Sequence, residues 1–201
     1  DLSLKILQDK LYLKQDYISN YISMTSSGKQ VKSATYFIKD EKFRSDANLL
    51  NEPITCFGRG NSIGYVEKSE VISHSEWIDV WKVYVPESNN IGTELSDDNQ
   101  NSFVGKPGTI CTETFLVVGA NLALDKTAST NLSKYLRTKF ARFMHSLAKI
   151  SQHGTTKTYQ FVPLQNFKSD SDINWNMPTE KVDKQLYAKY KLTDEEIKFI
   201  E

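Results

Sequence analysis

A glycine-rich segment, Phe57 to Gly64, contains the residues most suggestive of cofactor chemistry. It has the order Phe-Gly-Arg-Gly-Asn-Ser-Ile-Gly, so a β-like run leads into Gly-x-Gly. Such loops hold S-adenosylmethionine or a dinucleotide when a helix follows them. Here Ile63 to Val66 favours a strand instead, so we expect a hairpin or bulge in which glycine tolerates positive φ. Arg59 and Asn61 at its tip are candidates to contact a phosphate or a base edge.

The sequence lacks convincing motifs for methyl transfer and for phosphodiester cleavage. The tetrapeptide Asn/Asp-Pro-Pro-aromatic, which amino-methylating enzymes place against their target base, does not occur. A magnesium-dependent nuclease needs a carboxylate and an acid-x-Lys pattern on adjacent strands. Glu196-Ile197-Lys198 and Asp40-Glu41-Lys42 match by letters alone, because the first falls in a predicted helix and the second in a charged, solvated stretch. We predict no catalytic residue in this chain.

The histidines and cysteines predict neither a metal site nor a nucleophile. His74, His145, His153, Cys56 and Cys111 are scattered, without the short ligand spacings of a zinc site. The two cysteines form no CxxC and no disulfide framework, which favours a reducing, cytoplasmic environment. No Ser or Cys has the local signature of an activated nucleophile. We therefore expect no metal or cofactor in this chain.

The strongest charge pattern lies between Leu132 and Ile150, where basic residues occur without any acidic one: Lys134, Arg137, Lys139, Arg142 and Lys149. An exposed helix usually mixes both signs, so that pairs form four residues apart. The polar run from Ser151 to Lys157 adds further donors, among them Gln152 and His153. Two interpretations stay open: a positive stripe that binds phosphates, and an ordinary solvated helix face.

The totals fit a globular protein and do not by themselves indicate a nucleic-acid binder. The 201 residues suffice for one buried core, or for one domain with an appended tail. Lys and Arg number 25 and Asp and Glu also number 25, so the strongly basic character of many nucleic-acid binders is absent. No apolar run approaches the ~20 residues of a membrane span, and no signal peptide opens the sequence.

The elements that must position these residues follow an α+β pattern. Runs of β-branched and aromatic residues predict strands at 35–38, 54–57, 63–66, 81–85, 114–118 and 158–162. The polar stretch 86–108 is typical of a loop. Apolar spacings of three and four between Leu132 and Leu147 predict one long helix. Two short helices follow, one at 183–190 and one that begins at the capping box of Thr193 and Glu196. We expect a mainly antiparallel small sheet packed on the long helix, with a helical tail.

Several stretches share their order and spacing with a known family. They are TETFLVVG (112–119), YLRTKFARF (135–143), KISQH (149–153), YQFVPLQNF (159–167) and YAKYKLTDEEI (187–197), with looser agreement at GNSIGYV (60–66) and WKVY (81–84). Together they resemble the C-terminal region of large restriction-modification adenine-specific DNA methyltransferases of type II, including the fused restriction-methylase enzymes. The resemblance covers the chain from about residue 54 onward.

This resemblance implies a domain organisation. In that family the methyltransferase core lies upstream, and the C-terminal region holds the target-recognition domain. We accordingly expect 1–24 to be a linker or helix from an upstream catalytic domain, 25–168 the target-recognition domain, and 169–201 a C-terminal helical tail. The run that ends at Val162-Pro163-Leu164 is also similar to the recognition domains of type I specificity subunits, whose small sheet and loops enter the major groove.

The resemblance also implies ligands. The expected partners are double-stranded DNA and the upstream methyltransferase domain, whereas S-adenosylmethionine, and magnesium if a nuclease is fused, would belong to the parent enzyme. Besides Arg59 and Asn61, the candidate DNA contacts are Lys139, Arg142, Lys149, Gln152, His153 and Lys157. Because the catalytic core is absent, no methyl transfer is expected of this chain alone. Two alternatives stay open: a module that docks a partner subunit or domain, and a magnesium-dependent nuclease domain.

Overall fold

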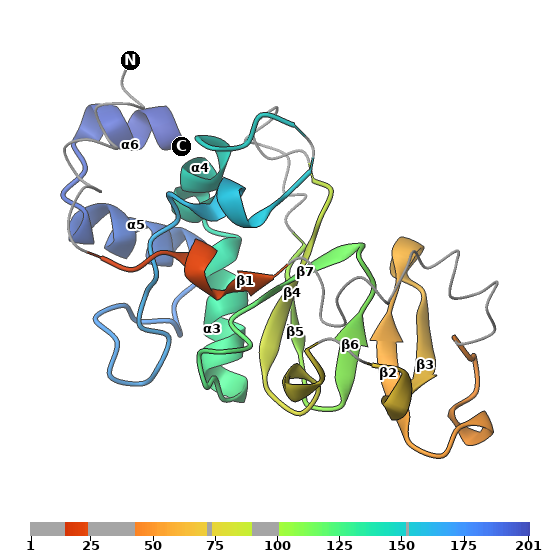
Figure 1. Ribbon diagram of the computed structural model, residues 1–201. Helices are drawn as coiled ribbons and strands as arrows, with labels where there is room; N and C mark the ends of the chain where they lie inside the picture. The colour runs from red at the N-terminus through yellow and green to blue at the C-terminus, as the bar shows by residue number, and fades with distance from the viewer. Residues whose placement is uncertain (1–14, 24–42, 72–73, 90–100, 152) are drawn as a thin grey trace.

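The computed structural model describes residues 15–23, 43–71, 74–89, 101–151 and 153–201. Their strands form two small sheets, and the α-helices gather on one side of the molecule, beside the first sheet (Figure 1). The expected α+β class is thereby confirmed. The predicted strand at 35–38 and most of the predicted linker at 1–24 lie outside the described residues.

The first sheet has four strands in the order β1, β7, β4, β5, each antiparallel to its neighbours. Their bounds are Ile22–Ser23 (β1), Phe115–Val118 (β7), Lys82–Pro86 (β4) and Phe103–Gly105 (β5). At the centre of the sheet, Val83 lies opposite Val118, and Val85 lies opposite Leu116. All of β7 and all but the last residue of β4 are buried, as their β-branched and aromatic composition indicates. The predicted strands at 81–85 and 114–118 are confirmed.

The second sheet has three strands in the order β3, β2, β6. Their bounds are Ile63–Glu67 (β3), Pro53–Phe57 (β2) and Thr109–Cys111 (β6). β2 and β3 form an antiparallel hairpin, which confirms the predicted strands at 54–57 and 63–66, whereas β6 runs parallel to β2. The sequence indicated neither β6 nor β5, which interrupts the expected loop at 86–108. A strand of three residues is too short to show a hydrophobic period.

The two cysteines lie on neighbouring strands of this sheet but on opposite faces. Cys56 is paired with Ile110, and Phe57 is paired with Cys111, so the thiols are offset by one residue. Cys56 belongs to a small apolar cluster on one face of the second sheet. Cys111 belongs to an aromatic cluster that includes Tyr84. Both cysteines are buried, and they are not joined in a disulfide.

The prediction of a single long helix between Leu132 and Leu147 is wrong, because two helices occupy this part of the chain. α3 covers Lys126–Leu136 and α4 covers Lys139–Ser146. Between them, Thr138 adopts an extended backbone, and its hydroxyl accepts a hydrogen bond from the Ala141 N–H at 3.1 Å. A threonine in this position caps the start of a new helix. Apolar spacing alone did not show the break, because α3 and α4 both bury their apolar residues in the same core.

The predicted strand at 158–162 is also wrong. The segment begins with the 3₁₀ helix η8, Thr156–Tyr159, and continues as a turn. The Thr158 hydroxyl bonds the backbone of Thr155, accepting from its N–H at 3.1 Å and donating to its carbonyl at 2.8 Å. This local hydrogen bonding competes with strand formation, although the residue types favour a strand. Within the described residues, the other short 3₁₀ helices are η2 (Ile18–Tyr21), η4 (Ala47–Leu49), η5 (Arg59–Asn61), η6 (Lys68–Glu70) and η7 (Ser75–Trp77).

Two helices near the end of the chain, α5 (Thr179–Lys189) and α6 (Asp194–Ile200), confirm the prediction of two short helices there. The capping box is present as expected: the Glu196 carboxylate accepts from the Thr193 N–H at 2.7 Å, and the Thr193 hydroxyl accepts from the Glu196 N–H at 3.3 Å. Both helices contribute to the largest apolar core, which lies between the first sheet and the helices and includes Val83, Leu116, Leu132, Phe140, Leu186 and Ile200.

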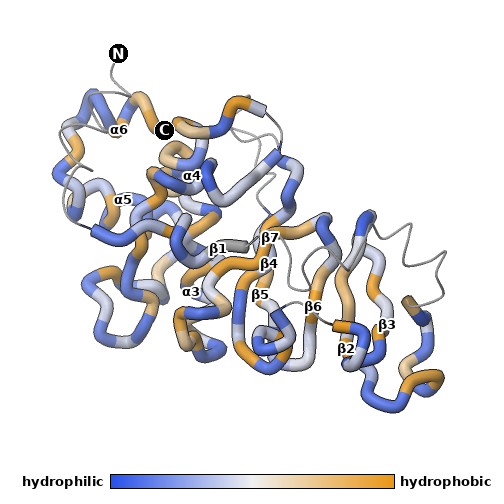
Figure 2. Tube along the Cα trace, in the orientation of Figure 1, coloured by the Kyte–Doolittle hydropathy of each residue, from blue (hydrophilic) through white to orange (hydrophobic). Residues whose placement is uncertain are grey.

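Hydropathy follows this architecture. Apolar residues are concentrated along the strands of both sheets, whereas the loop between η8 and α5 is mainly hydrophilic (Figure 2). Among the helices of the described residues, none combines the length and the apolar character that a bilayer span requires.

Candidate nucleic-acid interface

The turn between β2 and β3 confirms the hairpin interpretation of the glycine-rich segment. The Gly58 N–H donates to the Ser62 carbonyl at 2.9 Å, and Gly60 has φ of 66°, a conformation that favours glycine. β3 follows the turn directly, so no α-helix presents its N-terminus here to the phosphate of a cofactor. Arg59 and Asn61 both belong to the 3₁₀ helix η5 in this turn, and Arg59 is exposed.

A second group of predicted contacts lies where the end of β4 meets the segment between α4 and η8. His153 forms an isolated β-bridge with Ser88, and its ring Nδ1 lies 3.0 Å from a carboxylate oxygen of Glu87. The Gly154 N–H donates to the Glu87 carbonyl at 2.6 Å. Lys157 is exposed on η8. Gln152 lies outside the described residues.

Lys149, in contrast, is only 8% exposed. Its Nζ donates to the Asn89 carbonyl at 2.5 Å, and burial lowers the pKa of this lysine. The side chain therefore holds the turn after α4 against the segment that follows β4. This position gives Lys149 a structural role, which the sequence pattern did not indicate.

A third group surrounds the junction of α3, α4 and α5. Arg137, Lys139 and Arg142 line a polar pocket of about 280 Å³ together with Thr179, Glu180 and Asp183. Lys139 forms an ion pair with Glu201, with 2.5 Å between Nζ and Oε2. Arg142 is only 6% exposed, whereas Arg137 is exposed. The structure thus brings two of the predicted contacts together and adds Arg137 to them.

Asp183 organises this junction. Its two carboxylate oxygens accept the backbone N–H groups of Lys139, at 3.1 Å, and of Phe140, at 2.9 Å. Burial raises the pKa of Asp183 to about 6, although the two backbone hydrogen bonds act in the opposite direction. The negative charge that the start of α4 favours is therefore supplied by the protein itself.

The sequence-predicted stripe of positive charge is divided by the break at Thr138. Lys134 points its Nζ to the carbonyl oxygens of Trp175, at 2.6 Å, and Met177, at 3.0 Å. Lys139 and Lys149 are also engaged within the fold. Of the basic residues in this part of the chain, Arg137 and Lys157 are exposed and take part in none of the ion pairs among the described residues.

Sequence reasoning missed an amide-lined hollow of about 380 Å³ between α3, α5 and the loop that precedes α5. The amide side chains of Asn131, Asn174, Asn176 and Gln185, which can donate and accept hydrogen bonds, line it together with Lys168, which can only donate. Such side chains suit the edges of bases. The available signal was the density of Asn and Ser between residues 166 and 176.

The residues considered for nuclease or metal chemistry have other surroundings where the structure describes them. The described residues contain no cluster of three or more His, Cys, Asp or Glu side chains placed to hold a metal ion. Glu196 is buried in its capping box, and Asp40 to Lys42 lie outside the described residues. His145 is fully buried between Thr158 and Tyr159, where burial lowers its pKa to about 3.

Comparison with models of known protein families gives no match, and comparison with curated proteins gives none either.

Proposed function

We propose that this chain binds duplex DNA sequence-specifically, as the target-recognition domain of an adenine-specific restriction-modification methyltransferase. The observation that supports this best is the charge distribution. No acidic residue occurs between Asp125 and Asp170, although the chain as a whole is neutral. This acid-free stretch, residues 126–169, forms α3, α4 and η8. Its exposed cations, which take part in no ion pair among the described residues, are Lys126, Arg137, Lys157 and Lys168.

The roles within such a domain follow from the chemistry of its side chains. Exposed Lys and Arg neutralise phosphates and set the register on the duplex, independently of sequence. Arg59 on the β2–β3 turn and the amides of the hollow have the donors and acceptors that distinguish base edges. Methyl transfer and the extrusion of the target adenine belong to the catalytic domain of the proposed parent enzyme. The target-recognition domain would help to hold the distorted duplex.

The test is a salt titration of DNA binding. Fluorescence anisotropy with a labelled duplex, measured from about 50 to 200 mM salt, is expected to show affinity that falls steeply with salt. Arg137→Gln and Lys157→Gln are each expected to reduce the slope of log affinity against log salt by about 1. Lys198→Gln, an exposed lysine of α6 outside the acid-free stretch, is the matched control. Binding that ignores salt, or an equal loss in the control, would contradict the proposal.

A further inference from the structure

The polar pocket at the junction of α3, α4 and α5 has the size and the lining of a site for a small anion. Its volume of about 280 Å³ lies just below the range of roughly 300–1,000 Å³ that drug-sized ligands occupy. Its cations come from the residue that follows α3 and from the first turn of α4, and the other lining residues come from the first two turns of α5. In chain order the lining residues are Arg137, Lys139, Arg142, Thr179, Glu180 and Asp183.

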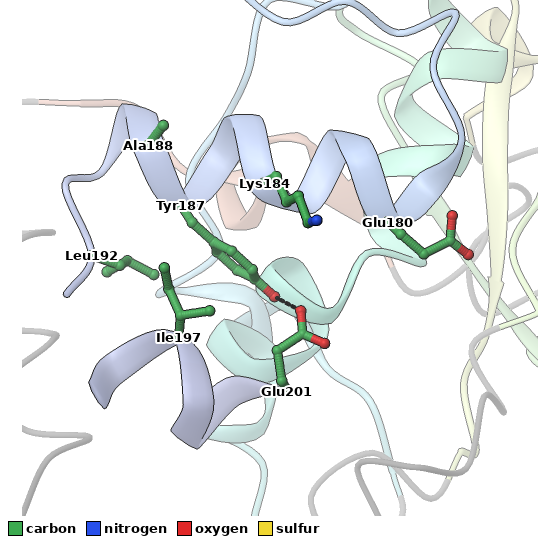
Figure 3. A pocket seen from close by; sticks show the side chains of 7 residues that line it. All are labelled: Glu180, Lys184, Tyr187, Ala188, Leu192, Ile197 and Glu201. Atoms are coloured by element: carbon green, nitrogen blue, oxygen red, sulfur yellow. Dashed lines mark hydrogen bonds between the residues drawn. The ribbon is translucent and has the colours of Figure 1, made fainter. Parts of the chain in front are cut away.

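Two of the charged groups in the pocket already have partners within the fold. The Lys139 ammonium pairs with Glu201, with 2.5 Å between Nζ and Oε2, and the Tyr187 hydroxyl donates to the other oxygen of this carboxylate at 3.0 Å (Figure 3). The Asp183 carboxylate accepts the two backbone N–H groups at the start of α4. Neither Lys139 nor Asp183 therefore depends on a ligand for a partner.

The remaining charged groups differ in depth. Arg137 and Glu180 are both exposed at the rim of the pocket, and neither takes part in an ion pair within the part of the chain that the structure describes. Arg142 is only 6% exposed and therefore belongs to the inner lining. The lining as a whole holds three cations and two carboxylates, so it carries a net positive charge. An anion is the complementary ligand, and Glu180 reduces the affinity for it.

The hydrogen-bond donors of the pocket indicate which anion fits. A guanidinium group is permanently charged, and its N–H donors form a planar fork that matches two oxygens of a phosphate. Arg137 at the rim and Arg142 further in supply two such groups, and the Thr179 hydroxyl supplies another donor. We propose that the junction of α3, α4 and α5 binds one phosphate group between Arg137 and Arg142. The proposed function supplies the source of this group, a phosphate of the DNA backbone, and to that extent the inference rests on it.

Titration of the 201-residue chain with inorganic phosphate tests the site without DNA. Phosphate replaces chloride at constant ionic strength and near-neutral pH, and the side-chain Nε–H signals of Arg137 and Arg142 are followed in ¹⁵N spectra. Both signals are expected to shift and to saturate. Arg59, exposed on the β2–β3 turn, is the matched control, and its signal should not saturate. Signals of Arg137 and Arg142 that move no more than that of Arg59 would overturn the inference.

Substitutions at the rim test the assignment to this pocket, because Arg137 and Glu180 are exposed and can be replaced without opening the core. Arg137→Gln is expected to weaken phosphate binding by about tenfold or more, through loss of a charged hydrogen-bond donor. Glu180→Gln should strengthen it about two- to fivefold, since the exposed carboxylate no longer repels the anion. Arg59→Gln should leave the phosphate affinity unchanged. Equal affinities in the unsubstituted chain and all three variants would contradict the assignment.

A competition measurement identifies the source of the phosphate group. If the DNA backbone supplies it, inorganic phosphate should weaken the binding of a labelled duplex more than chloride does at the same ionic strength, and Arg137→Gln should remove this difference. Phosphate binding without such competition would assign the pocket to free phosphate. Phosphate binding without any duplex binding would contradict the proposed function but support the pocket. A lack of saturable phosphate binding would overturn the inference even if the chain binds DNA.

Discussion

Asp183 accepts a hydrogen bond from the backbone N–H of Phe140 at 2.9 Å and thereby joins α5 to the first turn of α4. The second carboxylate oxygen accepts from the N–H of the preceding residue, Lys139. These N–H groups are among those that have no partner within a helix, so a tertiary contact stabilises the start of α4. The start of α4, directly after the break at Thr138, is thus stabilised by a side chain more than forty residues away.

The pH dependence of stability should reveal this carboxylate. Because the pKa of Asp183 is raised to about 6 in the folded chain, from 3.8, the folded state holds a proton between pH 4 and 6 that the unfolded state has lost. Stability from this group is present below pH 4 and is lost as the pH rises to 6. Asp183→Asn removes the ionisable group. The difference in unfolding free energy, variant minus unsubstituted chain, should therefore increase by about 3 kcal/mol between pH 4 and pH 7. Urea unfolding at both pH values measures this, and an equal difference at both would contradict it.

His145 should act in the opposite direction. Its pKa is lowered to about 3 by burial, from 6.5, so the folded chain binds fewer protons than the unfolded chain below pH 6.5. The stability that it contributes is therefore lost as the pH falls. His145→Phe keeps an aromatic ring beside Tyr159 and cannot be protonated. When the pH falls from 7 to 4, the free energy of unfolding should decrease by about 3 kcal/mol less in this variant than in the unsubstituted chain. An equal loss in the variant and in the unsubstituted chain would contradict this role of His145.

A buried lysine provides a third prediction. Lys82, on β4, is inaccessible to solvent, and its Nζ donates to the carbonyls of Trp77, at 2.7 Å, Val80, at 3.1 Å, and Ile78, at 3.2 Å. Lys82→Met leaves these oxygens without that donor and should cost about 2–3 kcal/mol of unfolding free energy. The exposed Lys68, paired with Asp79, is the matched control, since Lys68→Met should change stability by less than about 1 kcal/mol. A similar loss in both variants, measured by urea unfolding, would argue against the structural role of Lys82.

The sequence predicted those parts of the fold that depend on local pattern. The β2–β3 hairpin, β4, β7 and the capped start of α6 were all evident from residue types and spacing. The errors arose where local and distant interactions compete. Thr138 ends one apolar helical pattern by capping a second helix, and Thr158 bonds Thr155 where the residue types favour a strand. Basic residue types likewise indicated charge but not exposure, because Lys149 donates to a carbonyl sixty positions away.

This difference between charge and exposure gives the last prediction. Lys149 and Lys157 are equivalent in the sequence pattern, but Lys149 is buried against Asn89 and Lys157 is exposed on η8. If the acid-free stretch binds DNA, Lys157→Gln should weaken binding and leave the urea midpoint unchanged. Lys149→Gln should instead lower the free energy of unfolding by about 1–3 kcal/mol, because a buried carbonyl loses its charged donor. Under conditions in which it is folded, the Lys149→Gln variant should bind DNA with the same dependence on salt as the unsubstituted chain. If both substitutions reduced the salt dependence equally and left stability unchanged, Lys149 would be an exposed phosphate contact and its assigned structural role would be wrong.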